Sequence, residues 1–303
     1  MVIPHPIPYQ GSKRRIAHKI LDFFPPDTKR LVEPFAGSAA VTIAAAYHGK
    51  ATTFLINDLN EPLMRLWREI ILRPSRIADE YENLWHAQLG REREYYDVVR
   101  TRFNRTHEPH FLLYLLARCV KASVRYNSKG EFNQAPDNRR KGRKPSAMRK
   151  DIIAVSRLLK GRVEIRSVDF TEILERMTSA DLVYMDPPYQ GVCRDRDPRY
   201  LKGVEFHRFV DCLGMLNENS AQYIVSYDGL TGAKRHGRNL PASIGLLHMM
   251  IDAGTSSQST LLGRSERTIE SIYLSPSLSA RLGNVSVTQN IKSSEQTTLE
   301  DFV

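Results

Sequence analysis

The fold of this 303-residue chain is decided by residues 181–189, which read Asp-Leu-Val-Tyr-Met-Asp-Pro-Pro-Tyr. The run Leu182–Met185 is apolar and contains a β-branched valine, which predicts a short buried strand. Two prolines follow the acid at position 186, and neither has an N–H or a free φ, so the chain must leave the sheet there. The stretch therefore predicts a buried strand that ends in a rigid turn.

The end of this strand offers hydrogen-bond acceptors beside an aromatic ring. Asp186 brings a carboxylate, Pro187 a backbone carbonyl whose direction is restricted by Pro188, and Tyr189 a flat aromatic face. These groups suit a planar ligand that carries an amino group, such as the edge of a nucleobase. An ordinary strand-to-loop turn uses the same residue types, so the remainder of the chain has to decide between the two interpretations.

Composition limits the class of protein. Apolar residues make up 41% and charged residues 26% of the chain, which is typical of a soluble globular protein. The 44 Lys and Arg residues exceed the 34 Asp and Glu residues and give a net charge of +10, which favours a polyanionic partner. Cys119, Cys193 and Cys212 have no disulfide or metal-ligand spacing, and no apolar run approaches the roughly 18 residues of a membrane span. We expect a soluble protein of the reducing cytoplasm.

A strand, a turn and a helix are predicted over Leu31–Val41, with small residues around Gly37. Small residues let the backbone approach a ligand at the carboxyl end of the first strand of an open α/β sheet. The segment has neither Gly-x-Gly-x-x-Gly nor a P-loop, which disfavours a dehydrogenase and an NTPase. A second strand, Thr52–Ile56, leads to Asp58, about 20 residues after the glycine turn, where an acid can accept hydrogen bonds from ribose hydroxyls. Capping of the next helix is the alternative role for this acid.

A helical pattern of apolar residues over 16–24 follows the segment Tyr9–Lys13. Gly11 permits a close approach to a ligand, Ser12 can cap the helix, and Lys13 can meet a carboxylate. A capped surface helix is the alternative interpretation of the same residues.

The strand and helix alternation stops between about Glu61 and Gly161, where helical patterns occupy 64–72, 77–89 and 111–124. This stretch is far too long for a crossover connection, so we predict an inserted helical domain. Beyond it, strand patterns at 163–168, 223–228, 244–251 and 268–274, a helix at 206–219 and a polar loop over 190–203 complete the sheet.

The insert ends in a basic segment. Arg125–Gln134 interleaves cations with aromatic and amide side chains, and the basic run Arg139–Lys144 follows. Such residues can contact phosphates, wedge an aromatic ring between bases and read base edges. A basic run is also typical of a solvated loop, which is the alternative for Arg139–Lys144.

Three motifs now stand in order: E-P-F-A-G-S at 33–38, R-x-N-x-x-G-x-F-N at 125–133 and D-P-P-Y at 186–189. Together they resemble the Dam-like N6-adenine-specific DNA methyltransferases. The resemblance covers roughly residues 9 to 274 and implies an α/β fold, a Rossmann-like class I methyltransferase sheet with an inserted, mainly helical target-recognition domain. Ser38–Ala40 replaces the second glycine that more usually follows Gly37 in that family, which leaves the tightness of this turn open.

The resemblance also implies a division of the chain and a set of partners. Residues 1–60 and 163–275 would form the catalytic domain, residues 61–162 the DNA target-recognition domain, and residues 276–303, rich in Ser, Thr, Asn and Gln, a disordered tail. The implied cofactor is S-adenosyl-L-methionine and the implied substrate is double-stranded DNA whose target base is flipped. The expected location is a prokaryotic cytoplasm, in association with the nucleoid.

Site residues follow from the same resemblance, motif by motif. The implied catalytic residues are Asp186, Pro187, Pro188 and Tyr189. The implied cofactor-binding residues are Tyr9, Lys13, Glu33, Phe35, Gly37, Asp58, Asp169, Phe170 and Asp186. The implied DNA-binding residues are Arg125, Tyr126, Asn127, Lys129, Phe132, Asn133, Arg139, Arg140 and Lys141. No metal is implied.

Other functions are weighed against this one. Methylation of cytosine at C5 needs a nucleophilic cysteine, usually after a proline, and no cysteine of this chain follows one. Methylation of cytosine at N4 has the same geometry but usually a serine in place of Asp186, and it stays open. A DNA-binding module without activity stays open as well, although the intact 186–189 motif argues against it.

The end of the chain carries a short pattern of its own. Gln296, Leu299 and Phe302 are spaced like the peptides that tether DNA enzymes to replication sliding clamps, with one amide and two apolar anchors. A plain disordered tail is the alternative.

Overall fold

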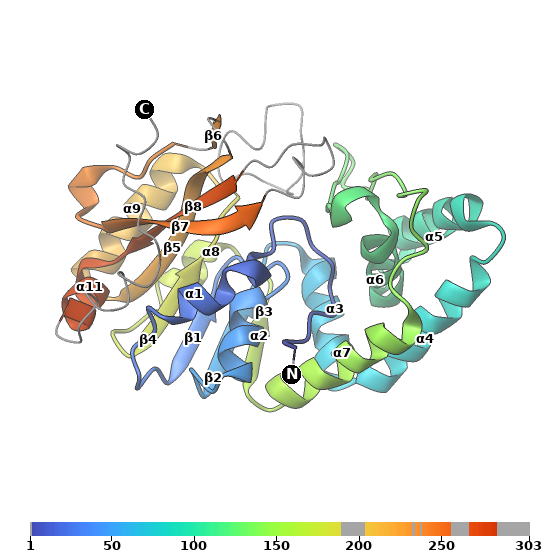
Figure 1. The fold of residues 1–303 in the computed structure, drawn as a ribbon, viewed down its shortest axis with the longest axis horizontal. Coiled ribbons are helices and arrows are strands. Elements are labelled where there is room, and N and C mark those ends of the chain that lie inside the picture. Colours follow the sequence, from blue (N-terminus) through green and yellow to red (C-terminus); the bar gives the residue numbers. More distant parts are fainter. Residues whose placement is uncertain (1, 189–203, 232–233, 237, 256–266, 284–303) are drawn as a thin grey trace.

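A computed structural model describes residues 2–188, 204–231, 234–236, 238–255 and 267–283 (Figure 1). Its strands are β1 (Arg30–Glu33), β2 (Thr53–Asn57), β3 (Val163–Arg166), β4 (Asp181–Met185), β5 (Gln222–Thr231), β6 (Lys234–His236), β7 (Leu247–Thr255) and β8 (Arg267–Leu274). Within these residues the sheet has the order β3-β2-β1-β4-β5-β8-β7, and β6 pairs with β5. The pairs among β1 to β5 are parallel, whereas β8 is antiparallel to β5 and β7. The predicted Rossmann-like sheet is therefore confirmed.

Helices cover both faces of the sheet (Figure 1). One face is covered by α1 (Ala17–Leu21) and α2 (Ala40–Tyr47), and the other by α8 (Phe170–Leu174) and α9 (Phe206–Glu218). The strands alternate between the two cores, as a sheet buried on both faces requires. In β4, Leu182 and Tyr184 belong to the first core, while Val183 and Met185 belong to the second.

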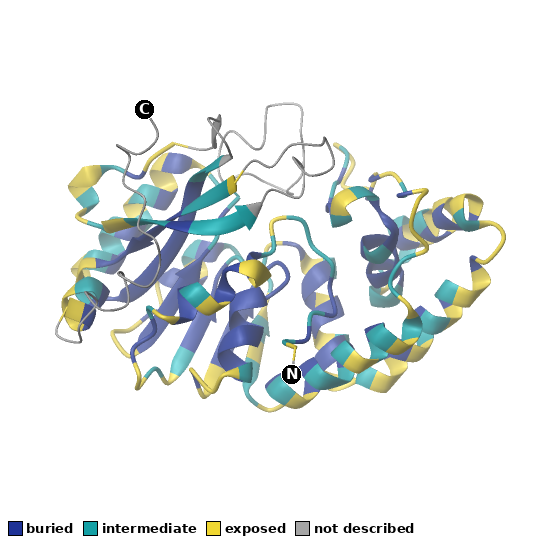
Figure 2. Cartoon of the chain, in the orientation of Figure 1, coloured by how far each residue is buried: buried dark blue, intermediate teal, exposed yellow. Residues whose placement is uncertain are grey.

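The long stretch between β2 and β3 is helical, as predicted. It contains α3 (Glu61–Leu72), α4 (Pro74–Ala87), α5 (Glu92–Thr106), α6 (Pro109–Arg118) and α7 (Pro145–Leu159). We did not predict α5 and α7, and α6 ends at Arg118 rather than near 124, because Cys119 is already extended. Figure 2 shows that dark blue, buried residues continue from the sheet through these helices. The apolar residues of the helices and of one face of the sheet in fact form a single core.

The domain division at residues 61–162 stays a prediction. A boundary there would separate helices that pack directly on the sheet and on α2. Helix α7 packs on α2 and on both α3 and α4, and α3 packs on β3. Helices α3 and α7 therefore form the crossover between β2 and β3 that covers the sheet. Helices α4, α5 and α6 extend from these two (Figure 1).

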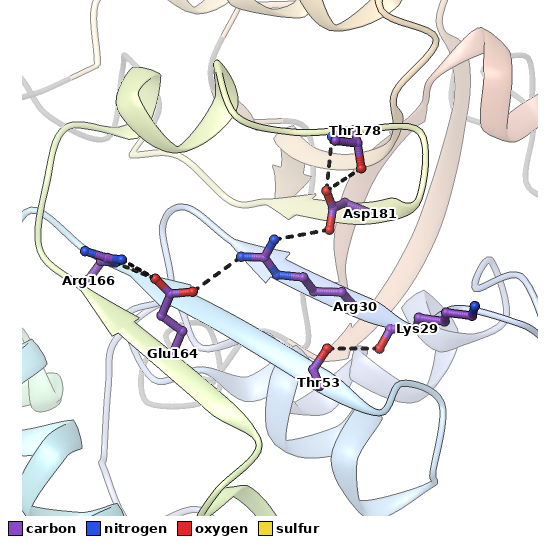
Figure 3. A network of polar contacts seen from close by, with 7 residues as sticks. All are labelled: Lys29, Arg30, Thr53, Glu164, Arg166, Thr178 and Asp181. Carbon is purple, nitrogen blue, oxygen red and sulfur yellow. Dashed lines mark hydrogen bonds and ion pairs between the residues drawn. The ribbon is translucent and has the colours of Figure 1, made fainter.

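Ion pairs join the strands at their amino ends (Figure 3). The Arg30 guanidinium lies 3.5 Å from Glu164 on β3 and 3.5 Å from Asp181 on β4. Thr178 donates its backbone N–H and its hydroxyl to the second Asp181 oxygen, at 3.0 and 2.9 Å. The network thus joins the amino ends of the strands. An open α/β sheet binds its ligand at the other end, beyond the carboxyl ends of the strands.

The predicted tail is shorter than expected, since α11 (Pro276–Gly283) is helical. Leu278 and Leu282 are buried in the first core, and Ser275 Oγ accepts a hydrogen bond from the Leu278 N–H at 3.2 Å. Arg281 pairs with Asp27 near the other end of the chain. The prediction of disorder is therefore wrong for 276–283, because a capped helix with two apolar anchors has a core to pack on. Residues 284–303 lie outside the described part of the chain.

None of the described helices combines the length and the apolar character that crossing a membrane would need.

Candidate active site

A cavity of about 450 Å³ lies at the carboxyl ends of β1, β2 and β4. The strand order reverses between β1 and β4, which is where open α/β sheets bind ligands. Of the residues predicted for catalysis and cofactor binding, all but one line this cavity: Tyr9, Lys13, Glu33, Phe35, Gly37, Asp58, Asp169, Phe170, Asp186, Pro187 and Pro188. The remaining one, Tyr189, lies outside the described residues. Segments far apart in the sequence thus meet at one place.

The glycine turn after β1 is held from three sides. Gly37 has φ +49°, and a Cβ at this position would lie 3.1 Å from the Tyr9 ring, so a larger residue would crowd it. The Gly37 N–H donates to Asp58 Oδ2 at 3.0 Å, and the Gly37 carbonyl accepts from Trp67 Nε1 at 2.9 Å. Ala39 has φ +48°, a left-handed conformation that costs a residue with a Cβ about 1 kcal/mol. The turn therefore keeps a glycine-like path without a second glycine.

Asp58 accepts hydrogen bonds both from this turn and from Asn60, the residue that precedes the next helix. Its Oδ1 accepts the Asn60 N–H at 2.9 Å, and Asn60 itself caps α3 by accepting from the Leu63 N–H at 3.3 Å. The alternative in which Asp58 caps the helix is therefore wrong. Burial raises the pKa of the Asp58 carboxyl, and the hydrogen bonds from Asn60 and Gly37 oppose the rise. Each carboxylate oxygen retains acceptor capacity for a ligand hydroxyl.

Sequence reasoning missed Asn57, which ties three strand ends together. Its Nδ2 donates to the carbonyls of Pro34 and Val168, both at 3.0 Å, and its Oδ1 accepts the Val168 N–H at 3.0 Å. A buried amide at the last position of a strand is the signal that would have found it, because such an amide must satisfy its polar atoms locally.

Asp186 emerges from β4 into a partly buried cluster of charges. Its Oδ1 lies 3.0 Å from Lys13 Nζ, and the two side chains are 21% and 8% exposed. Burial raises the pKa of Asp186 to about 6; Lys13 opposes the rise and Glu270 adds to it. Glu33 is fully buried and accepts the Thr42 N–H at 3.1 Å, and its burial raises its pKa to about 8, so it is mostly protonated at neutral pH.

Strand β3 stops at Arg166, and Asp169 caps α8 by accepting the Thr171 N–H at 3.0 Å. The Arg208 guanidinium of α9 donates two hydrogen bonds to the Asp169 carboxylate, at 2.8 and 3.1 Å. The same guanidinium lies over the Phe170 ring, 5.2 Å from its centre. Arg208, which sequence reasoning did not single out, thus lines the cavity beside an acid and an aromatic face.

The predicted DNA-binding residues separate into a buried and an exposed set. Phe132 is 1% exposed and packs edge-on against Tyr126, whose hydroxyl donates to Asn60 Oδ1 at 3.2 Å. The prediction that these rings wedge between bases is therefore wrong, since both belong to the core. Asn127 accepts the N–H groups of Lys129 and Glu131, both at 2.9 Å, and so closes the turn between the rings.

The remaining cations and amides lie nearer the surface. Arg125 is half-buried and Lys129 is exposed; Asn133, Arg139, Arg140 and Lys141 are also exposed. Apart from Tyr126, no predicted DNA-binding residue is among those that line the described cavity.

The reversed strand order, the glycine turn and the Asp-Pro-Pro end of β4 around one cavity define a Rossmann-like methyltransferase. Residues 9–247 match the D12 class N6 adenine-specific DNA methyltransferase family, and the chain belongs to this family. Membership implies a methyl donor and DNA as the class of substrate.

Relatives differ from this chain in length. The chain is 26% identical over 233 residues to the DNA N-6-adenine-methyltransferase of Escherichia phage P1, a match that covers 73% of this chain and 29% of that protein. It is 27% identical to the Type II methyltransferase M.MjaIII of Methanocaldococcus jannaschii, covering 73% and 85% respectively. It is 30% identical to the Retron Ec67 DNA adenine methylase of Escherichia coli, covering 60% and 62%. The chain therefore spans less than a third of the phage relative.

Proposed function

We propose that this chain transfers a methyl group from S-adenosyl-L-methionine to N6 of a flipped adenine at a specific site in double-stranded DNA. The observation that carries the proposal is that the Asp186-Pro187-Pro188 end of β4 opens into the same cavity as the Gly37 turn and Asp58. Acceptors for an amine and a cradle for a nucleoside ligand are thus adjacent.

The residues around the cavity fit S-adenosyl-L-methionine. A volume of about 450 Å³ lies within the range of small-molecule sites. Asp58 retains acceptor capacity for ribose hydroxyls. Asp169 and Phe170 line the same cavity and are the residues that the family resemblance assigns to the adenine, beside the Arg208 guanidinium that pairs with Asp169 and lies over the Phe170 ring. Tyr9 and the Gly37 turn would hold the methionine part, in agreement with the family resemblance. When bound, the cofactor supplies a sulfonium methyl group that is already activated.

The protein's own part is mainly positioning. The Asp186 carboxylate and the Pro187 carbonyl can accept the two N6 hydrogens of adenine and fix the direction of the nitrogen lone pair. The same two acceptors stabilise the positive charge that develops on the nitrogen. Expelling the base from the duplex costs a few kcal/mol, which stacking in the site can offset.

The test is direct. Incubation of the purified protein with S-adenosyl-L-methionine and genomic DNA, followed by mass spectrometry of the nucleosides, should give N6-methyladenine. N4-methylcytosine as the product would support the cytosine alternative. Binding of DNA without any methyl transfer would support the inactive module.

The basic run of the insert supports a proposal for phosphate contact. Arg139 and Arg140 pair with Asp137 at 3.4 and 3.5 Å, and Lys141 pairs with Glu92 at 2.9 Å, yet all three cations are exposed. Replacing the three by glutamine is expected to weaken binding to every DNA sequence. The salt dependence of log K should become flatter by about one unit for each lost phosphate contact. Fluorescence anisotropy over a salt series measures this slope.

A matched control removes the same charge elsewhere. Lys29, Lys50 and Lys160 are exposed and precede β1, β2 and β3 at the edge of the sheet away from the cavity. Their replacement by glutamine should leave most of the slope in place. If the slope of log K against log salt concentration stayed unchanged after the loss of the Arg139–Lys141 cations, these residues would be only a solvated loop.

A clamp contact of the tail is a separate proposal, supported by sequence pattern alone. Gln296, Leu299 and Phe302 lie outside the described residues. If the tail is a clamp peptide, a ring-shaped clamp should bind the full-length protein with micromolar affinity in calorimetry and lose it on Leu299→Ala with Phe302→Ala. Methylation of short duplexes should stay unchanged. Equal clamp binding by a chain that ends at Ser293 would contradict the proposal.

A further inference from the structure

The Lys13 ammonium lies between two carboxylates that come from opposite ends of the sequence. Lys13 Nζ is 3.0 Å from Asp186 Oδ1 and 3.5 Å from Glu270 Oε2. The Lys13 and Glu270 side chains are 8% and 15% exposed, so water screens the cluster weakly. Nothing in the sequence reasoning had singled out Glu270.

The strand pairing explains how Glu270 reaches this place. Ile272 and Leu274 of β8 belong to the same core as Tyr184 of β4. Because side chains alternate along a strand, Glu270 faces the same side of the sheet as Ile272, and Asp186 the same side as Tyr184. The two acids therefore extend the apolar rows of their strands toward one another, over the face that α1 covers.

Glu270 carries an acceptor with unused capacity. Among the described residues, its buried Oε2 accepts no hydrogen bond that meets normal geometry, and the Lys13 ammonium stands somewhat too far for a strong one. A buried carboxylate oxygen that lacks a close donor is costly to the fold. Such a residue is expected where function requires it.

Charge balance indicates what this function is. During methyl transfer a positive charge develops on the substrate amine, and a nearby negative charge stabilises it. If Lys13 and Asp186 formed an isolated pair, the ammonium would cancel the negative charge of Asp186. Among the described residues, the two carboxylates that lie around this one ammonium, those of Asp186 and Glu270, leave a net negative charge. Glu33 and Tyr184 also face Asp186, and burial raises the pKa of both, so each is mostly neutral at pH 7.

We propose that Glu270 is a positioning residue for methyl transfer. When the amine of the target base replaces the Lys13 ammonium beside Asp186, Glu270 continues to bind that ammonium. Its carboxylate also keeps the site negatively charged. The inference rests on the proposed function. It assigns to β8, the strand between β5 and β7, an electrostatic role in the reaction.

Glu270→Gln tests the proposal, because glutamine keeps the shape and removes the charge. The kcat for adenine methylation should fall on the order of tenfold, while the Kd for S-adenosyl-L-methionine changes little. Glu270 raises the pKa of Asp186, and Asp186 must be ionised to accept the amine hydrogens. The acidic limb of kcat/KM should therefore move to lower pH in the variant. An unchanged kcat and an unmoved limb would overturn the proposal.

Two further variants separate this role from a merely structural one. Glu270→Asp keeps the charge and should retain most of the activity, whereas loss of activity in both variants would indicate packing. In a Lys13→Met background, Glu270→Gln should change kcat less than twofold, because the ammonium that it holds is gone. An undiminished effect in that background would contradict the proposed route through Lys13.

The wild-type protein in the same assay distinguishes a failure of the proposed adenine methylation from a failure of the proposed role of Glu270. Absence of N6-methyladenine with wild-type protein would refute the proposed function. An active wild type with an equally active Glu270→Gln variant would refute only the role of Glu270. Glu164→Gln, which removes a glutamate at the far edge of the sheet, is the matched control and should behave like the wild type.

Discussion

Asp186→Ala is expected to abolish methyl transfer to DNA while binding of S-adenosyl-L-methionine stays measurable. In the proposed reaction the carboxylate acts on the amine of the target base, and alanine leaves only the Pro187 carbonyl as an acceptor. The loss of a group that acts on a reacting proton or a developing charge costs roughly 10²- to 10⁴-fold in rate. Single-turnover assays with excess protein measure the rate, and calorimetry measures the binding of the cofactor.

Two comparisons sharpen this test. Asp186→Ser keeps one oxygen acceptor and should be less damaging than alanine. The pKa of Asp186, raised to about 6 mainly by burial, predicts that wild-type activity falls as the pH drops below about 6, since the protonated carboxyl is a poor acceptor. Near-normal turnover of Asp186→Ala would remove the central claim about the site.

Asp58→Ala is expected to raise the Kd for S-adenosyl-L-methionine by about tenfold to a hundredfold, as the loss of a hydrogen bond to a charged group does. Two effects act together, because the variant loses the proposed acceptor for the ribose and also releases the Gly37 and Asn60 N–H groups. Affinity for DNA without cofactor should change little. Calorimetry and gel shifts measure the two quantities.

The control for this variant is Glu61→Ala, which removes a neighbouring exposed acid from the first turn of α3. It should leave the Kd unchanged. If Asp58→Ala also left the Kd unchanged, Asp58 would be only the internal acceptor that holds the glycine turn.

Much of the sheet and of the cavity was predictable because their signals are local. A β-branched apolar run that ends in Asp-Pro-Pro allows few structures, and the spacing from Gly37 to Asp58 is set by one strand–helix–strand unit. Helix α5 was missed because charged residues dominate its sequence, and α11 because eight residues give little periodicity.

The errors concern contacts between distant segments. Phe132 stands among polar residues in the sequence, but its place in the core depends on Phe103 and Tyr126. Glu270 could be recognised only as an acid in an apolar alternation, and its partner Lys13 lies near the other end of the chain. Local patterns carry no information on such pairs, whereas the sheet order determines them.

The common core of the helical segment and the sheet has a consequence for how target preference can change. Residues from α4, α5 and α6 share one apolar interior with α2 and the strands, so the segment is not a cassette that could be grafted from one scaffold to another. Tyr126 and Phe132 anchor even the polar turn between them in that interior. If the segment reads the target sequence, as proposed, the side chains that can vary without disturbing this interior are the exposed ones, such as Lys129 and Asn133.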